Sequence, residues 1–487
     1  MKSQLTIKLL LKNMFRFTII AAIIWVIYAF TTGVLLFIKH KKVSSEYIAK
    51  SSSIDYYSDE TGPDRVVLIE DPLESGLARM GIIRDAQTSL NIAYFSIDSG
   101  ESSELFFAAL LDAADRDVQV NLLLDGMFHG IKGELKSIFY ALMMHPNIDI
   151  KLYEPLSLIT PWTINNRMHD KYIIADNEIG MIGGRNIGDK YFNPDWYTKA
   201  VTNDRDVIII NTESDESASV INEMTSYFNE IWSHEYSEDL SIRLNKFRQK
   251  KGTEKQRELA DKLAQAKELH QDTMLQYSRL LDISVPTNKI TFIHNPITRF
   301  SKEPWCWYEL TKLMKSAKSS IFVQSPYFVP SKAMTKSYLD GIDTKNIDVF
   351  ILTNSLASTP NYPAFSGYIN HRKRLVDSGI TIFEYQSKDS IHAKAFTIDN
   401  DLLAIGTFNV DPRSAFLSTE SMVVIHSAEA AEKLDDGLMQ YIEESLVVGE
   451  DYEYIQSDSI EEVPVNIVKR AAVTILSYIV RLFEFLL

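Results

Sequence analysis

Short apolar runs alternate with helical patterns along the chain, and this order occurs twice. In each half the first apolar run is closed by an Asx-Pro pair, a helical pattern follows, and further apolar runs precede a motif common to both halves. Strands that alternate with helices predict βαβ units and a largely parallel sheet covered on both faces. The repeated order indicates an internal duplication. The expected strands are 65–69, 90–97, 118–124 and 148–153, then 289–293, 320–329, 347–352 and 380–385, with first helices at 77–86 and 308–317.

The N-terminal region contains an uncharged apolar stretch from Phe17 to Ile38. Its length is sufficient to cross a hydrocarbon core of about 30 Å. A cleaved signal peptide is the alternative, but no small-x-small cleavage signal follows, and the stretch is long for the apolar part of such a peptide. We therefore expect an uncleaved, single-pass anchor in the cell membrane. Basic residues flank both ends and do not set its orientation, but one N-terminal anchor favours an extracytoplasmic catalytic domain.

The last residues, 465–487, form an apolar helical pattern with a narrow polar stripe. Three of the four charged residues in this stripe are basic, as an interfacial membrane helix requires. A terminal amphipathic helix that docks on the catalytic core would show the same pattern, so both interpretations stay open. The stripe consists of Asn466, Lys469, Arg470, Thr474, Ser477, Arg481 and Glu484.

Two polar segments separate the expected folded units. Residues 46–64 are predicted to be a tether, and residues 237–286 a helical connector whose apolar residues recur at helical spacing. A solvated helix is the simpler interpretation of the connector, and a lid or partner-binding helix is the alternative. The expected organisation is an anchor at 1–45, the tether, a first domain at 65–236, the connector, a second domain at 287–450 and a terminal helix at 464–487.

Composition limits the class of protein. The 487 residues suit two globular units plus appendages, and 45% hydrophobic residues can supply a large core. The net charge is −15, whereas proteins that grip nucleic-acid phosphates are normally basic, so no nucleic-acid partner is expected. A single cysteine, Cys306, excludes an internal disulfide and a cysteine-based zinc site.

Two motifs of the form H-x-K-x-x-x-x-D carry the candidate chemistry, and each is followed by a glycine-containing turn and an asparagine. A single copy is a loose pattern, and a lone histidine on an apolar strand is usually a core residue. Two copies at a constant offset of 223 residues, in a repeated structural context, form a specific signal. The first consists of His169, Lys171, Asp176 and Asn186, and the second of His392, Lys394, Asp399 and Asn409.

A histidine and a lysine two positions apart on a strand project to the same face. If the duplicated halves meet, two imidazoles, two ammonium groups and two asparagine amides surround one cavity. This set fits a phosphodiester, because the cations and amides neutralise its oxygens. One neutral imidazole would attack phosphorus and the other, protonated, would donate to the leaving oxygen.

The carboxylates suit orientation better than metal binding. We expect Asp206 and Glu420, near strand starts, to bind the far nitrogens of the imidazoles and so fix their tautomers. Asp176 and Asp399 are predicted to be structural hydrogen-bonding groups. Each histidine has a lysine rather than a carboxylate as its neighbour on the same face, so no metal is expected.

These motifs resemble the phospholipase D superfamily over about residues 65–450, and in particular the bacterial cardiolipin synthases of the C type. The similar segments are Asn166-Arg-Met-His-Asp-Lys171 with Gly183 to Phe192, Ser390-Ile-His-Ala-Lys394 with Gly406 to Ser414, and the ending Phe483 to Leu487. The resemblance implies an α/β fold of two tandem phospholipase D-like domains with pseudo-twofold packing. It also implies a metal-free and cofactor-free enzyme.

The implied reaction is a two-step phosphatidyl transfer. His169 would form a phosphatidyl-histidine intermediate, and His392 would protonate the departing alcohol and then deprotonate the incoming one. The lysines and asparagines of the motifs would bind the phosphate, with Asp206 and Glu420 behind the histidines. The implied substrates are membrane phospholipids, phosphatidylglycerol and also phosphatidylethanolamine. One departure concerns the acceptor side, since Ser418-Thr-Glu420 replaces the usual Asn-Thr-Glu.

The sequence bears on three alternative functions. A phospholipase D hydrolase would use the same histidines with water as acceptor and release phosphatidic acid, and the sequence leaves it open because water exclusion depends on pocket shape. A nuclease is disfavoured by the acidic charge and the anchor. A degenerate scaffold would have lost at least one motif, and both are intact.

Overall fold

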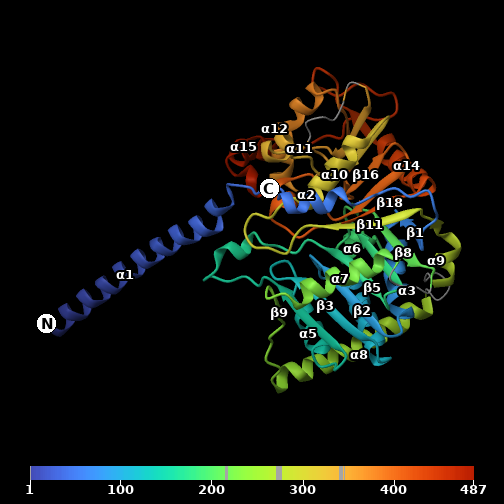
Figure 1. Ribbon diagram of the computed structural model, residues 1–487. Helices are drawn as coiled ribbons and strands as arrows, with labels where there is room; N and C mark the ends of the chain where they lie inside the picture. Colours follow the sequence, from blue (N-terminus) through green and yellow to red (C-terminus); the bar gives the residue numbers. More distant parts are fainter. Residues whose placement is uncertain (1, 214–217, 270–276, 339–343, 345) are drawn as a thin grey trace.

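Two mixed β-sheets form the centres of two halves in the computed structural model, which describes residues 2–213, 218–269, 277–338, 344 and 346–487. Figure 1 shows the first half in blue to green, the second in yellow to red, and one long helix that extends away from both. The duplicated α/β organisation expected from the sequence is confirmed.

The first half contains a nine-stranded sheet in the order β10-β1-β8-β6-β5-β2-β3-β4-β9. Its strands are β1 Asp64–Ile69, β2 Ser89–Tyr94, β3 Gln119–Asp125, β4 Ile148–Tyr153, β5 Lys171–Ala175, β6 Ile179–Gly183, β8 Asp206–Asn211, β9 Ser237–Asp239 and β10 Val285–Pro286. The helices of this half are α3 Pro72–Asp85, α4 Glu101–Asp115, α5 Leu135–Leu142, α6 Asp189–Phe192, α7 Val220–Ser233, α8 Lys246–Leu269 and α9 Tyr277–Ile283.

The second half contains an eight-stranded sheet in the order β11-β18-β17-β16-β12-β13-β14-β19. Its strands are β11 Lys289–His294, β12 Ser320–Gln324, β13 Asp348–Asn354, β14 Thr381–Tyr385, β16 Ala395–Ile398, β17 Leu402–Gly406, β18 Ser421–His426 and β19 Ser445–Val447. The helices are α10 Trp305–Ser316, α11 Lys332–Tyr338, α12 Tyr362–Asp377, α13 Pro412–Phe416, α14 Ala428–Glu443 and α15 Ile467–Phe483.

The sheets are mixed, so the expectation of largely parallel sheets is wrong. In the first sheet β2, β3 and β4 are parallel, whereas β5, β6 and β8 pair antiparallel, and the second sheet repeats this division. The strands after each motif histidine are joined by tight turns, which leave no room for the crossover that a parallel pair needs. The strands are continuously apolar and buried, as predicted, but many of the pairs are antiparallel.

The two Asx-Pro pairs contact the first helix of each half in different ways. Asp71 is the N-cap of α3, since it accepts a hydrogen bond from the backbone N–H of Glu74 (2.8 Å), and Pro72 occupies the first turn. Asn295 of the second pair lies further from α10, whose N-cap is Pro304, and accepts a hydrogen bond from the backbone N–H of Cys306 (3.1 Å). Only the first pair therefore caps its helix.

The two halves share a buried apolar core. Helix α7 of the first half lies against β11 of the second, and α14 of the second half lies against β1 of the first. A small parallel sheet of β7 (Thr202–Asn203) and β15 (Ser390–Ile391) also joins the halves. These reciprocal contacts are those of a pseudo-twofold arrangement, as the sequence predicted.

Both segments predicted to be separate from the domains are bound to them. In residues 46–64, expected to be a free tether, the Tyr47 ring stacks on Trp305 (centroids 4.4 Å apart) and the Tyr56 hydroxyl donates to Glu309 (2.7 Å). The connector at 237–286 supplies β9, α8, α9 and β10 to the first half, and Leu259 of α8 is fully buried. The apolar face of α8 packs on α4 and α5.

Helix α1 (Lys2–Gly33) extends away from the two folded halves, as Figure 1 shows. Residues Leu9–Phe37 form the one apolar segment in the described part of the chain that is long enough to cross a membrane. Two hydrogen bonds connect α1 to the loop after β4, from Trp25 Nε1 to the carbonyl of Leu158 (3.1 Å) and from the Tyr28 hydroxyl to the carbonyl of Ile159 (2.7 Å).

Helix α15 packs on α12 through polar residues of its predicted stripe. Lys469 Nζ donates to two carbonyl oxygens before α12 (2.9 Å each), Arg481 Nε donates to Asn370 (2.8 Å), and Glu484 binds His371 (2.9 Å). The helix therefore does dock on the core. Large apolar side chains nevertheless face outward on it, namely Ile467, Val468, Ile475, Tyr478, Ile479 and Leu482.

Asp206 is part of a buried ion cluster and contacts no histidine, which corrects the role expected for it. Its carboxylate binds Arg79 (2.9 Å) and Arg185 (2.7 Å) and accepts a hydrogen bond from Ser75 (2.7 Å). Burial alone would raise the pKa of Asp206, but the two guanidinium groups hold it below its ordinary value. This cluster ties α3 to β8 beneath the first motif.

We predict that Asp206→Asn destabilises the protein, because two guanidinium groups would lose their buried counter-charge. The expected loss of unfolding free energy is about 3–5 kcal/mol, measured by chemical denaturation of the detergent-solubilised full chain. Asp239→Asn is the matched control, since Asp239 is exposed and its pair with Lys151 (3.9 Å) is worth about 1 kcal/mol or less. Equal stability of the two variants would contradict the structural role of Asp206.

Candidate active site

Each motif histidine lies directly before a β-hairpin. β5 and β6 follow His169, and β16 and β17 follow His392. Both hairpins turn through an Asp-Asn pair with positive φ, 53° and 58° in the first and 55° and 56° in the second. Asn and Asp tolerate this left-handed conformation better than other non-glycine residues, and it suits a two-residue hairpin. The sequence thus places both histidines at equivalent hairpin ends.

The motif aspartates hold these turns to the neighbouring helix-to-strand loops. Asp176 accepts hydrogen bonds from the backbone N–H groups of residues 87–89 (2.7–2.8 Å), and Asp399 accepts them from residues 318–320 (2.7–3.1 Å). Burial would raise the pKa values of both carboxyls, but these hydrogen bonds lower them. The contacts fit the structural role expected for Asp176 and Asp399.

Backbone hydrogen bonds pass between the halves at each histidine. The N–H of His169 donates to the carbonyl of Thr419 in the second half (3.2 Å), and the N–H of His392 donates to the carbonyl of Asn203 in the first (2.7 Å). Thr419 belongs to the Ser418-Thr-Glu420 segment that departs from the family pattern.

Each imidazole is oriented by a carboxylate from the opposite half. His169 Nδ1 lies 2.9 Å from Glu420, and His392 Nδ1 lies 2.6 Å from Asp204. Glu420 therefore has the expected kind of contact, whereas Asp204, and not Asp206, is the second carboxylate. Because Nδ1 is engaged in each ring, Nε2 is directed to chemistry.

Strand register explains the shift from Asp206 to Asp204. Gly183 pairs with Asp206 across β6 and β8, and Gly406 pairs with Met422 across β17 and β18. The histidine-binding acid stands two residues before the paired position in both halves. Asp204 can be identified by counting two residues back from the partner of Gly183. This requires the strand register, which the sequence does not show.

The motif lysines are buried beside the histidines. Lys171 Nζ donates to the carbonyl of His169 (2.6 Å), and Lys394 Nζ donates to the carbonyl of His392. Burial lowers the pKa of Lys171 to about 7 and that of Lys394 to about 8. Burial thus disfavours the charge of both ammonium groups, and a bound anion would favour it.

Both motif asparagines line the same cavity as the histidines. The side chain of Asn186 accepts from the N–H of Ser96 (3.2 Å) and donates to the hydroxyl of Tyr191 (3.1 Å), so its amide is held in place. The side-chain oxygen of Asn409 is buried and has no hydrogen-bond partner in the described part of the chain. This oxygen only accepts hydrogen bonds, so the part of the Asn409 side chain that could bind a phosphate oxygen is its NH2 group.

The cavity between the halves has a volume of about 560 Å³. Both motif histidines and both asparagines line it, together with Glu420 and Arg413. Its apolar wall consists of Phe95, Met127, Phe128, Ile164, Leu486 and Leu487. The sequence analysis missed Arg413 as a site residue, although it belongs to the Asp-Pro-Arg-Ser segment after the second motif. The two motifs therefore meet around one cavity, as expected from the duplication.

The charges of the site favour an anionic ligand. Burial and the positive charges of Lys171 and Lys394 lower the pKa of His169 well below its ordinary value. Burial and Lys394 likewise lower the pKa of His392 to about 4. A phosphodiester placed among these groups would offset their mutual repulsion and raise all these pKa values. The site is therefore cationic within a protein whose net charge is −15.

Comparison with known proteins agrees with this geometry. The model of the family "Cardiolipin synthase, PLD-like domain" matches residues 80–232 and 310–442. The chain is 30% identical to cardiolipin synthase C of Escherichia coli over 415 residues, covering 76% of this chain and 83% of that protein. It is 28% identical to an uncharacterized Helicobacter pylori protein over 420 residues, covering 78% and 79%.

A solved structure shows the same fold at low sequence identity. The phosphatidylserine synthase of Haemophilus influenzae superposes with a TM-score of 0.61 and 11% identity, covering 87% of this chain and 95% of that one. The paired motifs, the shared cavity and the family match lead to one conclusion. The chain belongs to the cardiolipin synthase family of the phospholipase D superfamily, with two phospholipase D-like domains.

Proposed function

We propose that this protein is a phosphatidyltransferase of the cardiolipin synthase type, which moves a phosphatidyl group between alcohols through a phosphohistidine intermediate. One observation carries the proposal. Two imidazoles face a single cationic cavity, and the Nδ1 atom of each is bound by a carboxylate from the other half. The name of the Escherichia coli relative supports cardiolipin as the product.

In the first step His169 Nε2 attacks the phosphorus of a phospholipid. The bond from phosphorus to the headgroup oxygen breaks, and that oxygen takes a proton from protonated His392. The headgroup alcohol leaves, and the phosphatidyl group stays on His169. The lysines, the asparagine amides and Arg413 bind the non-bridging oxygens and stabilise the charge of the transition state.

In the second step the hydroxyl of an acceptor phospholipid gives its proton to His392 and attacks phosphorus. The phosphorus–nitrogen bond breaks, which restores His169 and releases the product. The acid and the base are thus the same residue in successive steps. We propose phosphatidylglycerol, and also phosphatidylethanolamine, as the lipids that enter these steps.

The two carboxylates differ in a way that supports this division of roles. Although burial would raise it, the pKa of Asp204 is held below its ordinary value by Lys394 and His392, so Asp204 stays charged and favours an imidazolium at His392. Burial raises the pKa of Glu420 to about 8, so its charge supports an imidazolium at His169 less strongly. A neutral His169 is the nucleophile and a protonated His392 is the acid.

The apolar wall of the cavity favours transfer over hydrolysis. Leu486 and Leu487 line the site together with Phe95 and Phe128. Such a wall reduces the water available to the phosphohistidine while an alcohol from a lipid is bound. This is the observation that separates the proposal from a phospholipase D hydrolase with the same histidines.

We further propose that α1 anchors the protein in the cell membrane, and that α15 contacts the leaflet on the side of the catalytic halves. The outward side chains of α15 include Val468 (71% exposed) and Leu482 (72%), whereas its polar residues bind the protein. An exposed apolar patch of this kind marks an interaction site, and a lipid surface fits a helix whose charges are mostly basic. The loop bound to α1 is similarly apolar, with Leu158 75% and Ile159 79% exposed.

The anchored topology is proposed to be single-pass with the catalytic halves on the extracytoplasmic side. A single span at the N-terminus, followed by two folded domains, supports this arrangement. No nucleic acid is proposed as a partner.

Assay of the purified full chain with phosphatidylglycerol tests the reaction, and two histidine variants test the roles. Wild type is expected to release glycerol and form cardiolipin, whereas phosphatidic acid alone would show hydrolysis. His169→Asn should abolish turnover. His392→Asn should slow it by about 10²- to 10⁴-fold, yet still release p-nitrophenol from a phosphatidyl p-nitrophenol donor, because that leaving group needs no proton.

His145→Asn is the control, since His145 binds Asp115 at the surface (3.1 Å) and should keep full activity. Trapping of the phosphatidyl-enzyme in acid, followed by peptide mass spectrometry, should place the label on His169. A label on His392, or full activity of either active-site variant, would overturn the assigned roles.

The pH dependence should report the buried lysines. In the free enzyme Lys171 and Lys394 lose their charge as pH rises through about 7 and 8, so kcat/KM should fall over that window. A bound phosphodiester raises their pKa values, so the fall in kcat should occur at higher pH. Lys394→Arg keeps the charge at that position, so it should remove the steeper fall above about pH 8 and leave the fall near pH 7 that belongs to Lys171. A kcat/KM that is constant between pH 7 and 9 would contradict this assignment.

The membrane contact of α15 is tested with a polarity-sensitive fluorophore on Tyr478→Cys in the full chain. On reconstitution into anionic liposomes its emission should shift to the blue, because the position enters the apolar part of the leaflet. Gln265→Cys, on α8 of the first half, should show no shift. Equal spectra at both positions would overturn the proposed contact, and labelling of Gln265→Cys by an impermeant maleimide from the outside of intact cells would support the topology.

A further inference from the structure

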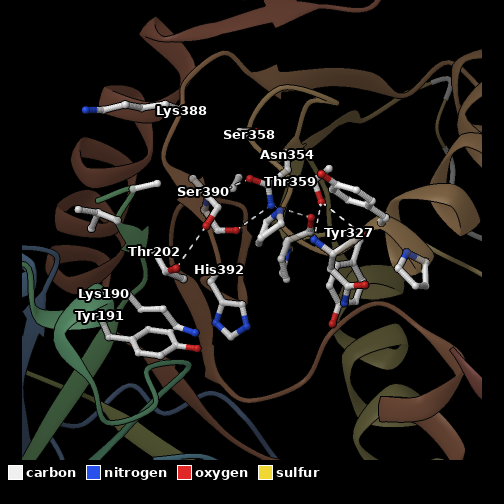
Figure 2. A pocket seen from close by; sticks show the side chains of 18 of the residues that line it. Lys190, Tyr191, Thr202, Tyr327, Asn354, Ser358, Thr359, Lys388, Ser390 and His392 are labelled. Atoms are coloured by element: carbon white, nitrogen blue, oxygen red, sulfur yellow. Dashed lines mark hydrogen bonds between the residues drawn. The ribbon is translucent and has the colours of Figure 1, made fainter. Parts of the chain in front are cut away.

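A second cavity adjoins the one that both histidines share, and His392 lines it as well. It has a volume of about 700 Å³, and Figure 2 shows His392 at its base. Tyr191, Tyr327 and His392 line both cavities, whereas His169 lines only the first. The two spaces therefore meet at the imidazole assigned as the acid and base. We call the second cavity the outer chamber.

The outer chamber is cationic. Lys190 and Lys388 line it, and among its described lining residues none is acidic. Lys190 is paired with Asp98 (2.9 Å) outside the lining, whereas Lys388 is exposed and has no ion pair within the described part of the chain. Lys469 Nζ lies 5.3 Å from the ring centre of Tyr362, which also lines the chamber. The lining of the chamber thus differs in sign from the net charge of the chain, which is −15.

Hydroxyl groups complete the polar wall. Figure 2 shows Thr202 and Ser390 between Lys388 and His392, and their hydroxyls are 3.4 Å apart. Lys190 and Tyr191 approach His392 from the first half in the same view. A ligand that extended from Lys388 to His392 would thus lie beside the hydroxyl groups of Thr202 and Ser390, which can donate hydrogen bonds to it.

The stereochemistry of phosphoryl transfer assigns this side to the alcohols. In an in-line displacement the attacking and leaving groups lie on opposite sides of phosphorus. With His169 Nε2 on one side, the departing alcohol and then the incoming one must lie on the other, at His392. Water or a small alcohol would need little space there, whereas the chamber can hold a whole phosphodiester headgroup.

We propose that the outer chamber binds the acceptor phospholipid, with Lys190 and Lys388 holding its phosphate while its hydroxyl reaches His392. This inference rests on the proposed transferase function and names the site of its second substrate. Ammonium groups suit a phosphate as point charges. Lys190, nearer to His392 in Figure 2, contacts the phosphate directly, and Lys388 at the rim guides and retains it.

The position of α15 gives this acceptor a route from the membrane. Leu476 of α15 lines the outer chamber, next to the outward apolar residues of that helix. A lipid whose acyl chains remain in the leaflet beside α15 would present its headgroup at the chamber mouth. The terminal helix thereby connects the bilayer with the acceptor side of the site.

Partition of the phosphatidyl-enzyme between two acceptors tests the inference in the full chain. With phosphatidylglycerol as donor and ethanol added, the enzyme forms cardiolipin from a phosphate-bearing acceptor and phosphatidylethanol from a neutral one. Lys190→Gln and Lys388→Gln should each lower the ratio of cardiolipin to phosphatidylethanol by about 10-fold, the effect of one lost charged contact. Lys388→Glu should lower it further, because the acceptor phosphate would then be repelled.

The ratio does not depend on the first step, so damage to His169 chemistry leaves it unchanged. Lys315→Gln, an exposed position on α10 that lines neither cavity, should keep the wild-type ratio. A ratio within twofold of wild type in both glutamine variants and in Lys388→Glu would overturn the acceptor site alone. Failure of wild type to form either product would instead overturn the proposed transferase function.

Discussion

The active site depends on an exchange of carboxylates between the two halves. His169 of the first half is bound by Glu420 of the second, and His392 of the second half is bound by Asp204 of the first. Neither half alone supplies a histidine with its orienting acid. The apolar core shared by α7, α14 and the two sheets therefore has a chemical consequence, because it brings each acid within hydrogen-bond distance of the opposite ring. Small shifts between the halves would disturb both imidazoles together.

Burial of positive charge is the second constraint. Two histidines line the cavity, two lysines are buried beside them, and the pKa values of all four groups are lowered. Positive charge is electrostatically unfavourable in such a site, and this cost would favour the proposed phosphodiester ligand. The acidity of the chain as a whole does not oppose this, since the local field in a buried site is set by nearby groups.

The terminal segment of the chain lies beside both cavities. On α15, Arg481 binds α12, Val473 is buried, and large apolar side chains such as Leu482 face outward. The helix also lines the outer chamber, and Leu486 and Leu487 line the catalytic cavity. The roles proposed for this segment in membrane contact, acceptor binding and water exclusion rest on these positions.

The sequence by itself determined the duplication, the order of strands and helices, the paired histidines, lysines and asparagines, and the turn aspartates, because each rests on local pattern or on a constant offset. It identified Glu420 but selected Asp206 instead of Asp204, since both stand near a strand start and only the pairing of Gly183 with Asp206 shows which one reaches a histidine. It predicted the wrong direction for most of the strands, and it did not show how residues 46–64, residues 237–286 and α15 dock on the two halves. Those depend on contacts between residues far apart in the chain, and tertiary packing alone decides them.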